Sequence, residues 1–104
     1  MNRFCYLFDL RPGSIDDYER EHAELWPGIA EVMRGAGITE FTLFRRGLTV
    51  IATGVTTRPI PETFALLNAD PLNIAWSAHI RQLMTDPTDE HGELRFAPEI
   101  WQLP

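Results

Sequence analysis

Tyr18-Glu-Arg-Glu-His22-Ala-Glu-Leu-Trp26-Pro27 is the stretch around which the rest of this chain is organised. Tyr18, His22 and Trp26 follow one another at intervals of four residues, so a helix would place phenol, imidazole and indole along one side. Two rings that stack and one group that titrates near neutrality suit a site for a small polar ring compound. The same spacing is also typical of ordinary core packing around a half-buried histidine. Spacing alone leaves both interpretations open.

The residues on either side of this stretch predict a strand before it and a broken helix through it. Residues 3–10 are mostly apolar on both faces, which is typical of a strand covered on two sides. Ser14 is a suitable N-cap for the helix that follows. Pro27 predicts a kink or a restart, because proline removes a helical hydrogen bond and clashes with the preceding turn. The glycines of residues 35–37 then end the helix.

A hairpin is predicted next. Residues 38–45 and 48–56 are rich in β-branched and aromatic side chains and are joined by a turn at Arg46 and Gly47. Gly54 lies inside the second run, where a glycine suggests a bulge or a close approach of another group to the backbone.

Two helices and a last strand complete the pattern. Residues 62–68 and roughly 72–84 are predicted to be helical, with Asp70 as a plausible cap between them. The acidic residues 86–92 predict a solvated surface loop. Residues 94–103 are predicted to form the last strand, and Pro98 would confine that strand to a sheet edge or a bulge.

The predicted order is therefore β-α-β-β-α-β, the α+β, ferredoxin-like arrangement of an antiparallel sheet with both helices on one face. The predicted strands show little polar alternation, so the other face of the sheet also needs a cover. A second copy of the chain is the simplest cover, and we expect a homodimer.

Length and composition restrict the classes of function. The 104 residues make a single domain, residues 1–104, with a formal net charge of -6 and nine scattered arginines. We expect no nucleic-acid partner, because phosphate neutralisation needs clustered basic residues. No apolar run is long enough to predict a transmembrane helix, and we expect no membrane partner. Cys5 is the only cysteine, so no internal disulfide is possible and a cytoplasmic location is expected.

The chain closely resembles the L-rhamnose mutarotase family over essentially its whole length. Four motifs support the resemblance: Tyr18-x3-His22-x3-Trp26-Pro27, Gly37 leading into Phe41-Thr-Leu-Phe44, Trp76 with Met84 eight residues later, and the ending Glu99-Ile-Trp-Gln-Leu103-Pro104. The resemblance implies a dimeric α+β barrel. It also implies a cofactor-free epimerase, an isomerase that interconverts the α and β anomers of L-rhamnose or a related aldose.

Specific residues follow from this resemblance. His22 matches the family's proton donor, and Tyr18 matches a tyrosine that binds the sugar and could relay the second proton. Trp26 belongs to the first motif and is a candidate for substrate binding, and Trp76 matches the first residue of a Trp-Trp pair that contacts the sugar. No metal ligand or cofactor is implied.

Three positions depart from the family pattern. Phe41 replaces a tyrosine, Ser77 replaces the second tryptophan of the pair, and Glu40 replaces an asparagine. Phe41 and Ser77 would still line the substrate site. We expect these changes to alter the preferred sugar more than the reaction, because His22 and Tyr18 remain.

Ring opening needs little machinery, since the ring oxygen gains a proton while the anomeric hydroxyl loses one. An imidazole with an ordinary pKa near 6.5 can give and regain that proton at neutral pH. Other classes stay open at this stage, because dimeric α+β barrels also serve as cofactor-independent monooxygenases, haem-binding proteins or silent ligand-binding modules. His79 follows Trp76 by three residues and could face the same cavity, although a surface position is favoured. His91 is expected in the solvated loop, and no histidine has a recognised metal-ligand spacing.

Overall fold

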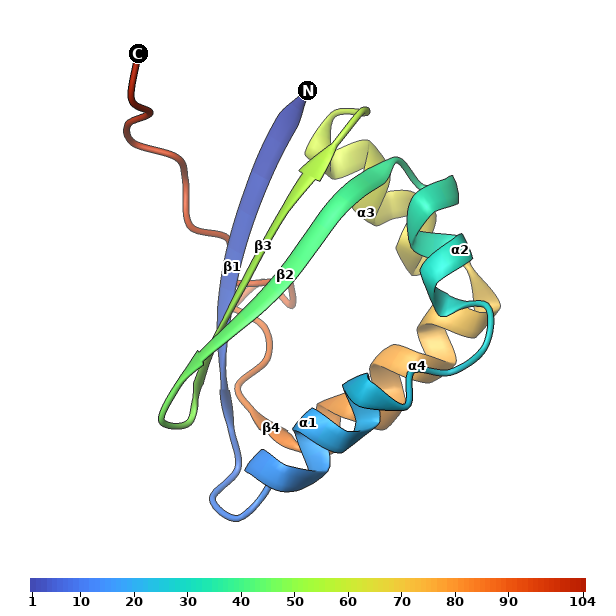
Figure 1. Ribbon diagram of the computed structural model, residues 1–104, viewed down its shortest axis with the longest axis vertical. Helices are drawn as coiled ribbons and strands as arrows, with labels where there is room; N and C mark the ends of the chain where they lie inside the picture. The colour runs from blue at the N-terminus through green and yellow to red at the C-terminus, as the bar shows by residue number, and fades with distance from the viewer.

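The computed structural model describes all residues, 1–104, and contains one antiparallel sheet of four strands. In chain order the strands are β1 (Asn2–Leu10), β2 (Ile38–Arg46), β3 (Thr49–Thr56) and β4 (Met84–Thr85). Across the sheet the order is β2-β3-β1-β4, so β1 and β3 occupy the centre. Figure 1 shows the long strands curving around the helices. The order and the antiparallel pairing confirm the predicted ferredoxin-like α+β fold.

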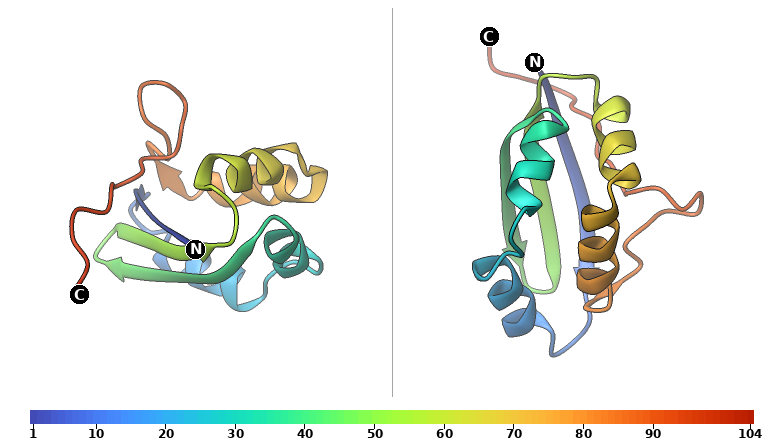
Figure 2. Two further views of the ribbon diagram at one scale, coloured as in Figure 1. Left: turned by 90° about the horizontal axis from the view of Figure 1, so that it is seen from above. Right: turned by 90° about the vertical axis from the view of Figure 1, so that its right-hand side faces the viewer.

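All four helices lie on one face of the sheet (Figure 2). They are α1 (Ile15–Ala23), α2 (Ile29–Gly35), α3 (Ile60–Ala69) and α4 (Pro71–Arg81). Each predicted helical region is thus divided into two short helices. Asp70 begins α4 as predicted, because its side chain accepts a hydrogen bond of 2.9 Å from the amide of Asn73. Ser14 occupies the N-cap position of α1, but its side chain makes no capping bond.

The break between α1 and α2 comes earlier than Pro27. Helix α1 ends at Ala23, so Leu25 and Trp26 already lie outside it. The ring of Pro27 would clash with the carbonyl of Ala23, four residues earlier, if the helix continued, which accounts for the early end. Gly28 is the N-cap residue of α2 and has a φ of 91°, a conformation that favours glycine. The prediction that Tyr18, His22 and Trp26 share one continuous helical side is therefore wrong at Trp26.

Pairing between β1 and β3 shows why Gly54 is a glycine. Phe4 lies opposite Gly54, and Tyr6 lies opposite Ala52. A Cβ added at Gly54 would lie 2.3 Å from the Phe4 ring, so the predicted close approach is confirmed. The small residues of β3 make room on the helix side of the sheet for the large rings of β1.

The predicted last strand is the main error in the fold. The fourth strand is Met84–Thr85, and residues 94–103 do not form a strand. Only a short part of that segment follows β1, with Tyr6 bridged to Phe96 and the Ala97 amide donating to the Cys5 carbonyl at 2.7 Å. Pro98 has no amide hydrogen to continue the pairing, and the chain leaves the sheet there. Figure 1 shows this tail running away from the body.

The sheet face away from the helices is only partly covered. Cys5, Leu7 and Ile51 are half-buried there, and Phe44 is 57% exposed. No helix in the structure is both long enough and apolar enough to cross a membrane.

Candidate functional site

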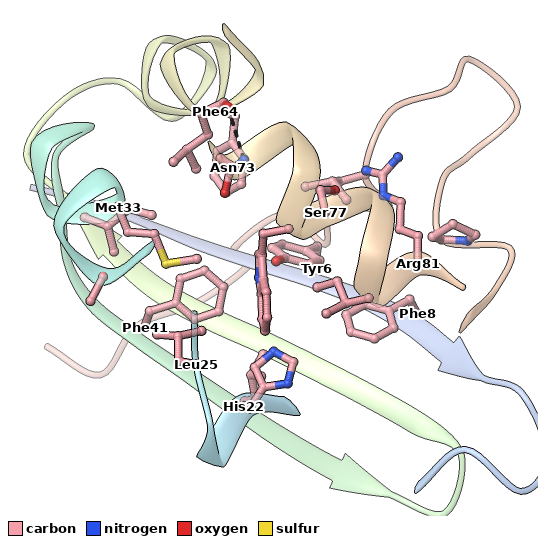
Figure 3. Close-up of a pocket in the computed structure, with 18 of the residues that line it drawn as sticks. Tyr6, Phe8, His22, Leu25, Met33, Phe41, Phe64, Asn73, Ser77 and Arg81 are labelled. Atoms are coloured by element: carbon pink, nitrogen blue, oxygen red, sulfur yellow. Dashed lines mark hydrogen bonds between the residues drawn. The ribbon is translucent and has the colours of Figure 1, made fainter. Parts of the chain in front are cut away.

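A cavity of about 510 Å³ lies between the sheet and the helices. Its lining includes members of two separate core clusters, one around Phe8, Tyr18 and Met84 and the other around Ile38 and Leu67. The cavity therefore divides the apolar core into two halves. Its volume is within the range of about 300–1,000 Å³ that is typical of small-molecule sites. Figure 3 shows side chains from both the strands and the helices converging on it.

Helix α1 contributes Tyr18 and His22 to the cavity lining. Their ring centroids are 4.4 Å apart, as expected for positions i and i+4 of a helix. Tyr18 is 5% exposed and packs edge-on against Phe8 of β1 at 5.8 Å. The sheet thus fixes the phenol, and the helix places the imidazole beside it.

The backbone fixes the proton arrangement of His22. Its Nδ1 lies 2.9 Å from the carbonyl oxygen of Tyr18. A carbonyl oxygen only accepts hydrogen bonds, so Nδ1 carries the hydrogen and donates it. In the neutral ring Nε2 then holds the free lone pair, and in the charged ring Nε2 carries the exchangeable proton. One defined nitrogen of a cavity-lining histidine is therefore left to take or give a proton.

Trp76 of α4 holds the imidazole from the other side. Its side chain is 2% exposed and lines the cavity, with its ring centroid 5.4 Å from that of His22. Trp26 packs edge-on against Trp76 at 5.3 Å but does not line the cavity. The structure thus places Trp26 behind the cavity wall, as support for Trp76.

His79 and Glu21 close the outer side of this aromatic group. His79 Nε2 lies 3.0 Å from a carboxylate oxygen of Glu21, which joins α4 to α1. The His79 ring also lies 5.1 Å from that of Trp26. His79 is partly exposed and does not line the cavity, and His91 is exposed in the loop after β4.

The three positions that depart from the family pattern all line the cavity. Phe41 packs edge-on against Phe4 at 5.5 Å, and its ring presents no polar atom. Ser77 is half-buried one residue after Trp76, and Glu40 is exposed on β2. The structure therefore brings Tyr18, His22, Phe41, Trp76 and Ser77 to one cavity.

Sequence reasoning missed several polar side chains of the same cavity: Tyr6, Arg34, Asn73 and Arg81. Three of them had a usable signal in the sequence. Tyr6 shares the inward face of β1 with Phe4 and Phe8, and Arg81 follows Ser77 by four residues on one helix. Asn73 precedes Ser77 by four residues and so had the same signal as Arg81, whereas Arg34 had none, because only the tertiary fold brings α2 to the cavity.

Burial raises the pKa of both cavity tyrosines. It raises the pKa of the Tyr18 phenol well above its ordinary value, and repulsion from Tyr6 raises it further. Burial also raises the pKa of Tyr6, against the opposing effect of the nearby positive charge of Arg81. Both hydroxyls are therefore hydrogen-bond donors at neutral pH. No group of three His, Cys, Asp or Glu side chains is arranged to hold a metal ion.

Known proteins share both the sequence pattern and the fold. A family model described as L-rhamnose mutarotase matches residues 3–103. An L-rhamnose mutarotase of Burkholderia ambifaria is 32% identical over 89 residues, covering 86% of each chain. The crystal structure of L-rhamnose mutarotase from Formosa agariphila superimposes over the full length of both chains with a TM-score of 0.79 and 16% identity.

A second solved structure shows that this fold also serves other chemistry. Tetracenomycin F2 cyclase from Streptomyces glaucescens, a polyketide cyclase, covers the full length of both chains with a TM-score of 0.71 and 17% identity. At that identity the likeness shows the fold alone. The match of the family model to residues 3–103, together with the 32% identical relative, shows that this chain belongs to the L-rhamnose mutarotase family.

Proposed function

We propose that this protein is a sugar mutarotase, an isomerase that interconverts the α and β anomers of an aldopyranose, with His22 as the proton-transfer group. Membership of the L-rhamnose mutarotase family supports the reaction. The observation that supports the role of His22 is the hydrogen bond from its Nδ1 to the Tyr18 carbonyl, which leaves Nε2 free beside the cavity.

The chemical step is a proton exchange at two oxygens of the sugar. In its charged form His22 donates the Nε2 proton to the ring oxygen, and the bond between that oxygen and the anomeric carbon breaks as the anomeric hydroxyl gives its proton to water. The open aldehyde rotates and recloses on its other face; the attacking hydroxyl returns its proton to Nε2, and the carbonyl oxygen takes a proton back from water to become the new anomeric hydroxyl. General acid–base help of this kind contributes about 10²- to 10⁴-fold, enough for a reaction that already proceeds in water.

Tyr18 and Trp76 have supporting roles in this proposal. The Tyr18 hydroxyl is protonated at neutral pH and donates a hydrogen bond to a sugar oxygen. Trp76 offers an apolar surface to the C–H side of the ring and holds the His22 imidazole in place. Trp26 acts behind Trp76, so its contribution to substrate binding is indirect.

We also propose that the working form is a homodimer. The sheet face away from the helices carries apolar side chains that no helix covers, including Phe44. The tail adds Ile100, Trp101 and Leu103, which are 94%, 71% and 76% exposed. Exposed apolar surface of this extent is typical of protein interfaces. Light scattering at micromolar concentration tests the dimer, and the 11.9 kDa monomer mass would contradict it.

A cytoplasmic location and independence from any cofactor remain predictions. They rest on the single cysteine and on the family resemblance.

Saturation-transfer NMR between the two anomeric protons tests the function. L-rhamnose, L-fucose, D-galactose, D-glucose and D-galacturonate are compared with and without catalytic amounts of protein. We expect exchange of at least one aldose to be accelerated well above the rate in buffer. Unchanged exchange for every sugar would contradict the proposed activity.

A further inference from the structure

One end of the cavity is positively charged and has no carboxylate partner. Arg81 on α4 lines this end together with Ser77, one helical turn earlier, and Tyr6 from the facing strand β1. Figure 3 shows the Arg81 side chain extending back along α4 toward Ser77. Positions i and i+4 of a helix lie on the same side, so the Arg81 guanidinium and the Ser77 hydroxyl line the same end of the cavity.

The charge at this end contrasts with the rest of the molecule. The chain has a net charge of -6, and five arginines form ion pairs with carboxylates: Arg3, Arg20, Arg45, Arg58 and Arg95. Arg34 and Arg81, the two arginines that line the cavity, belong to none of the ion pairs. Glu40 is the only acidic residue in the lining. The cavity of an acidic protein therefore carries a net positive charge.

Tyr6 supplies a second donor at the Arg81 end. Neither the Tyr6 hydroxyl nor the Arg81 guanidinium hydrogen-bonds another group of the chain, and no fully buried polar side-chain atom lacks a partner. Their hydrogen-bonding capacity is therefore open to the cavity. Arg81 is close enough for its charge to oppose the rise in the pKa of Tyr6 that burial causes. The guanidinium can only donate hydrogen bonds, and the neutral phenol near it can donate one as well.

We propose that Tyr6, Ser77 and Arg81 form a subsite for the carboxylate of an acidic aldopyranose, so that the preferred substrate is a hexuronate. The proposal rests on the mutarotase function proposed above. A hexuronate carries its carboxylate on C5, where L-rhamnose carries a methyl group. The planar guanidinium donates two parallel hydrogen bonds to a carboxylate, and the Tyr6 and Ser77 hydroxyls donate to its remaining lone pairs.

Charge balance favours a carboxylate over the other groups that could occupy this end. A neutral hydroxymethyl group or a methyl group would leave the exposed guanidinium hydrogen-bonded to water, with no counter-charge from the sugar. A phosphate ester carries up to two negative charges, but only one guanidinium lies at this end. A carboxylate matches the single charge and the donor count.

Equilibrium binding of methyl glycosides tests the subsite. Methyl glycosides cannot open, so their affinity does not depend on whether the protein catalyses anomerisation. The probes are the methyl glycosides of galacturonate, galactose and galactose 6-phosphate, titrated by NMR into the wild-type protein and into Arg81→Gln. Arg46→Gln is the control variant, because Arg46 is exposed at the end of β2, forms no ion pair and does not line the cavity.

The wild-type protein should bind the galacturonoside about five- to tenfold more tightly than the galactoside. This range is intermediate between a solvent-exposed ion pair and a buried charged hydrogen bond, because Arg81 itself is exposed. Arg81→Gln should remove that preference and change galactoside affinity by less than about twofold, and Arg46→Gln should change neither.

Equal affinity for the two glycosides, or a preference that survives Arg81→Gln, would overturn the subsite. Tighter binding of the 6-phosphate would assign this end to a phosphorylated sugar and would also overturn it. If Arg81-dependent binding of the galacturonoside is found but no free aldose or hexuronate exchanges faster, the subsite stands and the mutarotase function fails. If a free aldose or hexuronate exchanges faster but the galacturonoside shows no Arg81-dependent binding, the mutarotase function stands and the subsite fails.

Discussion

Replacing Tyr18 by phenylalanine separates the two roles open to this residue. The change removes only a hydroxyl that forms no hydrogen bond within the chain, and it keeps the ring that packs on Phe8 and His22. If the hydroxyl donates a hydrogen bond to the sugar, its loss costs about 0.5–1.5 kcal/mol. That range corresponds to a fall in kcat/KM of about 2- to 13-fold. The free energy of unfolding should change by less than about 0.5 kcal/mol.

The assay is saturation transfer between anomeric protons, run over a range of sugar concentrations so that kcat and KM are separated. A fall of about 10²- to 10⁴-fold, mainly in kcat, would refute this reasoning and make Tyr18 the second acid–base group. Unchanged kinetics would show that the hydroxyl does not touch the sugar. Urea unfolding of the variant checks that the fold is intact.

Three further predictions concern stability and cofactor use. Gly54→Ala should lower the free energy of unfolding in urea by about 1–3 kcal/mol because its Cβ would meet Phe4, whereas Gly35→Ala, with open space and a helical backbone, should not destabilise. Stability should fall as the pH rises above about 10, where Tyr6 and Tyr18 ionise in the unfolded chain but stay neutral in the fold, and replacing both by phenylalanine should flatten that part of the curve. Dialysis against a chelator should leave the anomerisation rate unchanged, and loss of activity that zinc restores would contradict a cofactor-free reaction.

Local sequence signals predicted most of the fold because each of its elements begins or ends at a residue with a strong backbone preference. Asp70 divides the second helical region where expected, the first region breaks before Pro27, and Gly54 marks the close contact with Phe4. The last strand was misplaced because residues 94–103 contain the right side chains for a strand. Backbone hydrogen bonding to β1 stops at Ala97, one residue before Pro98, and periodicity does not show how far a pairing extends.

The candidate site was only partly predictable from the sequence. Tyr18 and His22 were found because both lie on α1, where spacing along the chain determines spacing in space. Trp26 had the same spacing, yet the helix ends before it, and the indole supports Trp76 from outside the cavity. In the sequence, Tyr6 is recognisable only as a residue of the first strand. The positively charged end of the cavity is not visible there, because this end forms only where β1 and α4 face each other.

The role of His22 is tested most directly by its replacement with glutamine, which keeps similar bulk and hydrogen bonding but cannot titrate. Anomeric exchange of the best substrate is measured by saturation transfer for the wild-type protein, His22→Gln and the control His91→Gln. His91 is a suitable control because its side chain is exposed in the loop after β4. We predict that His22→Gln loses at least about tenfold in rate, with its mass and melting temperature little changed, while His91→Gln matches the wild type. Full activity in His22→Gln would contradict the assignment of His22 as the group that exchanges the proton.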